Sequence, residues 1–199
     1  MGRTQSFDTA EAVTAARNVF WNKGFEGTSL PDLERATGLS RSSLYHAFDS
    51  KRGLFDAAVQ NYLDTVIRPR LRPLTAEPIS PDALANYLTG LSQAITAPSN
   101  DSARNGCLLL NSAAGMASHD EAMRAVVEAY RAELGAAFER GLIAASAHGS
   151  HSDLTPDQVV TTARVLTSLT ISAFLIARIN PQEAANILEA ALSQLPTSG

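Results

Sequence analysis

Residues 24–55 read GFEGTSLPDLERATGLSRSSLYHAFDSKRGLF and contain the clearest boundaries of secondary structure in the chain. Ser29, Ser40 and Ser50 each precede a run of helix-forming residues, where a hydroxyl can accept a hydrogen bond from the first helical turn. Gly38 lies between the first two runs and can adopt the positive φ that a tight turn requires. The segment therefore predicts three successive helices: from Ser29 to about 37, over 41–48, and from 51 to about 67.

The first two of these helices form a helix-turn-helix motif that spans about Ser29 to Phe48. Their steep crossing requires apolar contacts, and the residues at suitable offsets are Leu33, Leu39, Leu44 and Ala47. The outward face of the second helix then presents small or hydrogen-bonding side chains: Arg41, Ser42, Ser43, Tyr45 and His46. A helix with such a face fits the major groove of double-stranded DNA, where base edges offer donors and acceptors.

A further helix is expected before this motif, from Asp8 to Asn22. Asp8 can cap it, because Glu11 follows three residues later in the spacing of a capping box. Its apolar face consists of residues that recur at helical spacing: Ala12, Val13, Ala16, Val19 and Phe20. Gly24 marks its C-terminal end.

Beyond residue 67 the composition changes, because Pro69, Pro73, Pro78 and Pro81 fall within thirteen residues. Such a cluster is typical of a linker, so we place a domain boundary near residues 68–80. No alternation of period two is long enough for a strand, and further helices are expected at 81–95, 104–117, 119–147, 156–179 and 181–194. The predicted fold is all-α, with a three-helix helix-turn-helix DNA-binding domain over residues 1–67 and a larger helical ligand-binding and dimerisation domain over residues 68–199.

The net charge of −4 is unevenly distributed along the chain. Residues 1–72 contain ten Lys and Arg against eight Asp and Glu, a net charge of +2, whereas residues 73–199 contain six against twelve, a net charge of −6. The N-terminal part is therefore the one expected to face phosphate. The single cysteine, Cys107, cannot form an internal disulfide, which agrees with a reducing compartment.

Neither an export signal nor a membrane span is expected. Thr4 to Thr9 is polar where the apolar core of a signal peptide would follow Arg3. The most apolar stretch, Val165 to Ala177, contains four hydroxyl side chains and falls short of the roughly 20 residues that cross a bilayer. We therefore expect a cytoplasmic protein without a membrane partner.

Three spaced elements in the N-terminal part resemble the DNA-binding domain of the TetR/AcrR family of regulators: residues 24–30 (GFEGTSL), 38–48 (GLSRSSLYHAF) and 50–55 (SKRGLF). The resemblance covers roughly residues 8–63 and implies an all-helical dimer whose C-terminal domain binds an inducer. Residues 106–111 (GCLLLN) also resemble a C-terminal pattern of this family.

One position departs from the usual helix-turn-helix pattern. Glu34 stands five positions into the first helix of the motif, where a small residue is typical. Its carboxylate must bend outwards or find a partner, for which Arg35 and Arg41 are the nearest candidates.

The candidate DNA-contacting residues are Thr28, Ser29, Ser40, Arg41, Ser42, Ser43, Tyr45, His46 and Lys51. The resemblance implies that Tyr45 and Lys51 contact phosphates, and a helix N-terminus suits phosphate in any case. Thr28 and Ser29 could add hydroxyl contacts to the DNA backbone. Base edges would be read from the outward face of the recognition helix, where Arg41 is best placed to bind a guanine. The alternatives are a core aromatic with an exposed hydroxyl for Tyr45 and ordinary surface side chains for His46 and Lys51.

Two features of the C-terminal half bear on assembly. Residues 159–177 are apolar nearly all round, which indicates burial on more than one side, and the last helix has its own stripe of Ala184, Ile187, Leu188, Ala191 and Leu192. The family resemblance places a homodimer interface on these last two helices, and the alternative is a deeply buried helix in a monomer. A dimer predicts a near-palindromic operator, from which an unidentified small-molecule effector releases the protein.

The candidate effector-binding residues are Tyr87, Leu91, Cys107, Leu110, Asn111, Tyr130, Leu134 and Phe174. Cys107 is expected to be a buried structural thiol, because no basic neighbour in the sequence would lower its pKa, and a redox or electrophile sensor is the alternative.

Two other functions remain open. His148, His151 and Asp153 could ligate a metal in an enzyme, although their loop offers no helical or strand frame. A ligand-independent DNA-binding and dimerisation module is the second alternative, although dimerisation alone needs less than a C-terminal region of over 100 residues. No catalytic residue, metal site or cofactor is predicted, since the sequence contains neither a phosphate-binding loop nor a nucleophile elbow.

Overall fold

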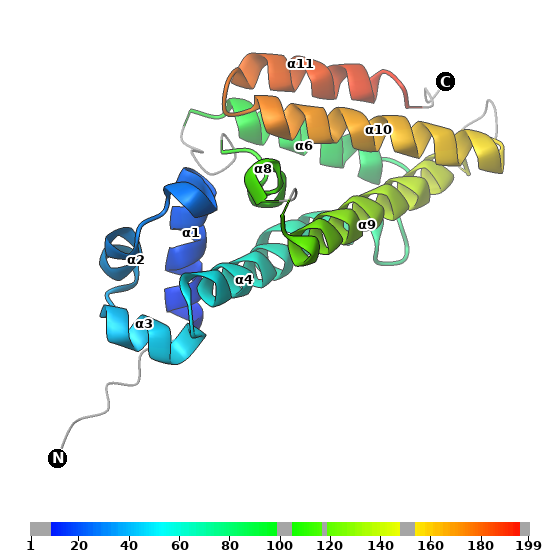
Figure 1. Cartoon of the computed structure of the whole chain (residues 1–199). Coiled ribbons are helices and arrows are strands. Elements are labelled where there is room, and N and C mark those ends of the chain that lie inside the picture. The colour runs from blue at the N-terminus through cyan, green and yellow to red at the C-terminus, as the bar shows by residue number, and fades with distance from the viewer. Residues whose placement is uncertain (1–8, 99–104, 117–118, 148–153, 196–199) are drawn as a thin grey trace. The chain divides into compact units, whose positions relative to one another are not determined.

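The computed structural model describes residues 9–98, 105–116, 119–147 and 154–195. Every regular element in these ranges is helical, which confirms the all-α prediction (Figure 1). The chain divides between Ile67 and Arg68 into two compact units, here called the N-terminal unit and the C-terminal unit.

The N-terminal unit consists of α1 (Thr9–Gly27), α2 (Leu30–Thr37), α3 (Arg41–Phe48), α4 (Lys51–Tyr62) and the π-helical turn η1 (Leu63–Ile67). α1 packs against α2 and α4, and the edge-to-face rings of Phe20 and Phe55, with centroids 5.1 Å apart, join α1 to α4. The regular part of α1 ends at Gly24, which adopts a φ of 74° as the sequence predicts. The expected cap, Asp8, lies outside the described residues.

The crossing of α2 and α3 depends on two leucines. Leu33 and Leu44 are 0% and 4% exposed, and Leu39 is half-buried. Ala47 is exposed, so its predicted role in the crossing is wrong. α3 has only eight residues, and Ala47 lies in its second turn, beyond the contact that Leu44 makes.

The proline cluster does not form an extended linker at its start. The chain continues without a break as α5 (Arg68–Leu71) and the 3-10 turn η2 (Arg72–Leu74), with Pro69 and Pro73 as their second residues. Leu71 and Leu74 are 1% and 0% exposed and hold both turns against the interior. The prediction of a linker over residues 68–80 is therefore wrong up to Leu74.

The C-terminal unit continues with α6 (Ala83–Thr96), α8 (Leu108–Met116), α9 (Glu121–Ser146), α10 (Pro156–Ile176) and α11 (Pro181–Leu192). α11 packs against α6 and α10, and α10 also packs against α9 (Figure 1). The apolar face of α9 is buried at Met123, Tyr130, Leu134, Phe138 and Leu142. α8 begins at Leu108 and not at residue 104, because Gly106 has a φ of 68°, outside the helical region.

α10 corrects the expectation about membrane spans. It has 21 residues, and an 18-residue window of it has a mean hydropathy of 1.7, which suffices to cross a membrane by length and composition alone, whereas the prediction considered only Val165 to Ala177. A core helix meets the same criteria, and 39% of the apolar window of α10 is buried within the chain. The helix nevertheless leaves Val160, Val165 and Leu175 43%, 43% and 44% exposed.

Candidate functional site

α3 presents the predicted polar face to solvent. Ser40 caps the helix, since its hydroxyl accepts a hydrogen bond from the Ser43 N–H at 3.3 Å, and Leu44 anchors the opposite side in the core. Arg41, Ser42, Tyr45 and His46 are all exposed. α3 is therefore held by its cap and by one buried leucine, and its free face offers hydrogen-bonding groups to a partner.

The serines of this face form a cluster around the cap. The Ser40 hydroxyl lies 2.9 Å from that of Ser42 and 3.0 Å from that of Ser43. Ser43 is half-buried, whereas Ser40 and Ser42 are exposed. Ser42 is therefore the more accessible hydroxyl for a base edge, and Ser43 serves mainly to complete the cap.

Glu34 resolves the departure found in the sequence. Its carboxylate accepts a hydrogen bond at 2.7 Å from the backbone N–H of Arg41, the first residue of α3. The partner is thus the main chain of Arg41 and not a guanidinium. A carboxylate at this place also complements the positive end of the α3 dipole, so Glu34 acts as a second cap that fixes α3 relative to α2.

Two predicted contact residues place their cations over aromatic rings. The Arg41 guanidinium lies 5.6 Å from the centroid of the Tyr45 ring, and the Lys51 ammonium lies 4.5 Å from that of Phe25. In the described residues neither cation forms an ion pair, whereas Lys23 and Arg52 bind Asp32 and Asp56. Stacking orients Arg41 and Lys51 without neutralising them, which leaves both charges available to an anion.

A tight turn between α3 and α4 positions Lys51. Asp49 adopts a φ of 63° at the end of α3, and the Ser50 hydroxyl caps α4 by accepting a hydrogen bond from the Gly53 N–H at 3.0 Å. A Cβ on Gly53 would lie 2.1 Å from the Phe48 carbonyl oxygen. Only glycine therefore allows the first turn of α4 to approach the end of α3 so closely.

Thr28 does not belong to the exposed surface, contrary to its predicted role. It is 1% exposed, and its hydroxyl donates to the Gly24 carbonyl at 2.6 Å. Ser29 is exposed, but its hydroxyl and N–H both donate to the Asp32 carboxylate, at 2.7 and 3.1 Å. Both hydroxyls thus stabilise the entry to α2.

Asp32 joins α1 to the start of α2. Its carboxylate accepts hydrogen bonds from the Lys23 ammonium at 2.6 Å and from Ser29. The hydrogen bond from Lys23, followed by those from Ser29, holds the pKa of Asp32 well below its usual value. The helix-turn-helix is therefore stabilised by an acid that is charged throughout the physiological pH range.

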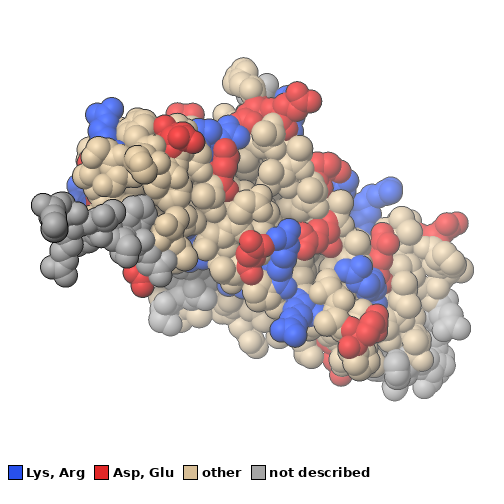
Figure 2. Space-filling view, turned by 90° about the horizontal axis from the view of Figure 1, so that it is seen from below, with Lys and Arg blue, Asp and Glu red and all other residues tan. Residues whose placement is uncertain are grey.

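Charges of both signs are interleaved on the molecular face that Figure 2 shows, without a broad area of either one. This pattern agrees with the weakly positive balance of residues 1–72. The weakly positive balance of residues 1–72 favours binding of an anionic partner through a few placed cations rather than through an extended basic surface.

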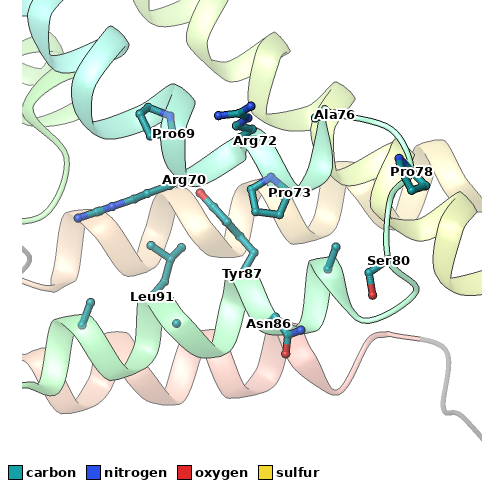
Figure 3. A pocket seen from close by; sticks show the side chains of 13 residues that line it. Pro69, Arg70, Arg72, Pro73, Ala76, Pro78, Ser80, Asn86, Tyr87 and Leu91 are labelled. Carbon is teal, nitrogen blue, oxygen red and sulfur yellow. The ribbon is translucent and has the colours of Figure 1, made fainter.

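The C-terminal unit contains a pocket of ≈ 750 Å³ between α6 and the segment from Pro69 to Ser80 (Figure 3). Two predicted effector-binding residues, Tyr87 and Leu91, line it. The sequence analysis missed Arg70 and Arg72, which line it as well. Both arginines lie in the proline-rich segment that the sequence analysis interprets as a linker, although this segment lines the pocket.

The other six predicted effector-binding residues do not line this pocket: Cys107, Leu110, Asn111, Tyr130, Leu134 and Phe174. Cys107 is fully buried, which agrees with a structural thiol. Asn111 is half-buried and donates to the Asn105 carbonyl at 2.7 Å. The other four are buried in the helical core, so core packing explains why these residues are apolar or aromatic.

The proposed metal ligands His148, His151 and Asp153 lie outside the described residues. Within those residues, no group of three or more His, Cys, Asp or Glu side chains is arranged to hold a metal ion.

Comparison with known proteins gives concordant matches. Residues 12–58 match the family model of bacterial regulatory proteins, tetR family. The chain is 32% identical over 179 residues to the uncharacterized HTH-type transcriptional regulator YezE of Bacillus subtilis (strain 168), which covers 90% of each chain. It is 35% identical over 111 residues to the HTH-type transcriptional repressor ComR of Escherichia coli (strain K12). This second match covers 55% of this chain and 51% of ComR.

A solved structure extends the similarity over both units. It is that of a cysteine-substituted form of the TetR family transcriptional regulator CifR, complexed with 26-bp double-strand operator DNA. The two chains are 28% identical with a TM-score of 0.80, and the match covers 98% of this chain and 100% of that chain.

Proposed function

The chain belongs to the TetR family of bacterial regulatory proteins, and on this premise we propose that it is a repressor that a small molecule releases from its operator. Members of this family are DNA-binding transcriptional regulators. The proposal adds that this chain binds a near-palindromic operator as a homodimer. It assigns no catalytic step to the protein and places its action in the cytoplasm, where the bacterial chromosome lies.

The observation that carries the proposal is the exposed face of α3. Arg41, Ser42, Tyr45 and His46 point away from the buried Leu44, and Lys51 begins the next helix with an unneutralised ammonium. Side chains that donate and accept hydrogen bonds read base edges in the major groove, and the flanking phenol and ammonium suit phosphates. CifR, whose structure is similar, was solved with operator DNA bound.

The exposed apolar side chains of α10 support a dimer. Val160, Val165 and Leu175 are each more than two-fifths exposed, and Ile179, just beyond the helix, is 79% exposed. α10 already packs against α9 and α11, so these side chains form a further apolar surface that a second copy would cover. Two-fold symmetry would then place two recognition helices about 34–36 Å apart and require a near-palindromic operator.

The pocket in the C-terminal unit supports release by a small molecule. Its volume of ≈ 750 Å³ lies within the usual range for sites of drug-sized ligands, which favours a ligand-responsive regulator over a ligand-independent module. A ligand shifts the protein away from DNA only as far as it binds the released state more tightly than the DNA-bound state.

The proposal is tested by selecting bound fragments from genomic DNA with the purified chain, while light scattering measures its mass. We expect an enriched motif with two-fold symmetry and a mass of two chains. A monomer that shows no preference among random duplexes at moderate salt would overturn the regulator proposal. A symmetric motif bound by a monomer would overturn the proposed homodimer but not the proposed DNA binding.

A further inference from the structure

We infer that the pocket beside α6 takes an organic anion, namely a small molecule that carries one carboxylate on an apolar body. The inference rests on the proposed function, because it specifies the chemical class of the effector. It concerns only the C-terminal unit, in which every residue that lines the pocket lies.

The charge of the pocket is the first argument. Arg70 and Arg72 are both among the residues that line it, and no Asp or Glu residue is. Both arginines are exposed, and neither forms an ion pair with an acid in the described part of the chain. Glu77 and Asp82, the acids nearest to the wall in sequence, are outside the lining. The pocket is therefore a cationic cavity that lacks an anion of its own.

Tyr87 supplies a neutral donor beside these cations. Figure 3 shows its side chain rising from α6 toward the segment that carries Arg70 and Arg72, with the hydroxyl at the end nearest to Arg70. The back of the ring packs edge to face on Phe138, with centroids 5.5 Å apart. Burial raises the pKa of the Tyr87 phenol above its usual value. The phenol therefore keeps its proton and can donate a hydrogen bond to a carboxylate oxygen.

Apart from Ser80 and Asn86, the remaining lining is apolar and selects the body of the ligand. Pro69 and Pro73 line the side of the segment, and Leu91 and Ala94 line the side of α6. Proline rings and short aliphatic side chains offer apolar contact area but no hydrogen-bonding groups. They therefore favour a hydrocarbon chain or ring over a sugar or a nucleotide.

Arginine is the side chain best suited to hold such an anion. Its planar guanidinium binds a carboxylate with two parallel hydrogen bonds, and these are stronger than bonds between neutral groups. A neutral analogue of the same size would leave the guanidinium groups without a partner, and a cationic analogue would be repelled. We therefore expect affinity to follow the charge of the ligand and not only its apolar area.

The segment that carries Arg70 and Arg72 lies at a position that suits regulation. The segment from Pro69 to Pro78 is the part of the chain that directly follows the N-terminal unit. A ligand held by Arg70 and Arg72 would stabilise one conformation of this connecting segment, and such a preference is what ligand-dependent release of DNA requires.

The test uses calorimetry on the full chain with two matched series of probes: decanoate, decanol and decylamine, and 2-naphthylacetate with its amide. At least one anion is expected to bind about tenfold more tightly than its neutral and cationic analogues, as one lost charge-assisted contact implies. The double variant Arg70→Gln with Arg72→Gln should lose this preference. The control Arg131→Gln, which removes an exposed arginine on α9 that pairs with Glu128, should keep it.

The inference is overturned if neither anion binds, if the neutral analogues bind equally well, or if the double variant retains the preference. Operator binding of each variant is measured in parallel, which separates the two proposals. An anion that binds through the arginines without releasing DNA supports the ligand class and contradicts ligand-dependent release. Loss of the charge preference in a double variant that still binds operator supports the ligand class without disturbing the DNA-binding proposal.

Discussion

Both units contain a glycine pressed against a carbonyl oxygen, but the two contacts differ in range. A Cβ on Gly53 would lie 2.1 Å from the oxygen of Phe48, and a Cβ on Gly106 would lie 2.1 Å from that of Phe174. The first contact shapes the single turn between α3 and α4, whereas the second joins the start of α8 to the end of α10. The turn before α4 thus depends on a near neighbour in the sequence, whereas the start of α8 depends on a remote segment.

The cations of the two units differ in a related way. Arg41 and Lys51 lie over aromatic rings that orient them on an exposed helical face. Arg70 and Arg72 line a concave pocket without an acidic partner in its lining. The cations of α3 and α4 are therefore oriented before a partner binds, whereas those of the pocket would find their partner in a bound ligand.

The two glycines provide the largest expected effect. Gly106→Ala combines the overlap with Phe174 and the strain of a positive φ, and we expect a loss of about 3 kcal/mol of unfolding free energy for the C-terminal unit. Gly53→Ala should instead abolish operator binding, because the turn that positions Lys51 must open. Thermal unfolding and fluorescence anisotropy with labelled operator measure the two outcomes.

Gly115→Ala is the matched control, since a Cβ there meets nothing within 4 Å and the residue lies within α8. This change should stabilise the protein by about 0.5–1 kcal/mol. Operator affinity of wild-type strength in Gly53→Ala would contradict the importance of the local contact.

The cations of the DNA-facing surface provide the next effect. Lys51→Ala should weaken binding to every duplex by roughly tenfold to a hundredfold and reduce the slope of log affinity against log salt by about one. Arg41→Ala should change which operator variants are preferred, because a base contact is lost. Titrations of a panel of operator variants at several salt concentrations distinguish the two. An unchanged ranking in Arg41→Ala would disprove its base-reading role.

A smaller effect is expected at Glu34. Glu34→Ala removes the acceptor for the Arg41 N–H and should cost about 1 kcal/mol, the usual value of a helix cap. Glu34→Gln retains an acceptor oxygen without the charge and should recover most of that stability. Equal melting temperatures for Glu34→Ala and the wild type would show that the serine cap alone fixes α3.

The smallest effect concerns pH. The pKa of Asp32 is lowered in the folded protein, so its stabilising contribution is complete above the unfolded pKa of about 3.9 and is lost as the pH falls through the folded value. Asp32→Asn should therefore melt a few degrees below the wild type at neutral pH, and the difference should shrink in acid below about pH 4. A difference that is constant between pH 7 and pH 3 would contradict this assignment.

The parts of the fold that local chemistry decides could be predicted from the sequence. Ser29, Ser40 and Ser50 cap the helices expected after them, and Gly38 adopts a φ of 69° in the turn. Each signal acts within four residues, so it is visible without knowledge of the rest of the chain. Thr28 is buried, contrary to the prediction, because its burial depends on tertiary packing, which its hydroxyl chemistry does not reveal.

The pocket could be predicted only in part for the same reason. Tyr87 and Leu91 were identified from their helix, but the facing wall consists of a proline-rich segment that resembles a linker. Leu71 and Leu74 fold this segment into helical turns by being buried, and that burial depends on helices that follow much later in the chain. The Arg140 guanidinium, which donates to the Leu74 carbonyl at 3.1 Å, is one such distant partner.

The carboxylate of Glu34 has a consequence for how α3 meets nucleic acid. The start of a helix attracts phosphate, but here a side chain of the protein already satisfies the Arg41 amide and acts as an internal surrogate for that anion. If α3 enters the major groove, the sugar-phosphate strand nearest to this end meets like charge. Nonspecific binding to any duplex would then be weakened more than binding to the correct bases, and the ratio of cognate to random affinity would increase.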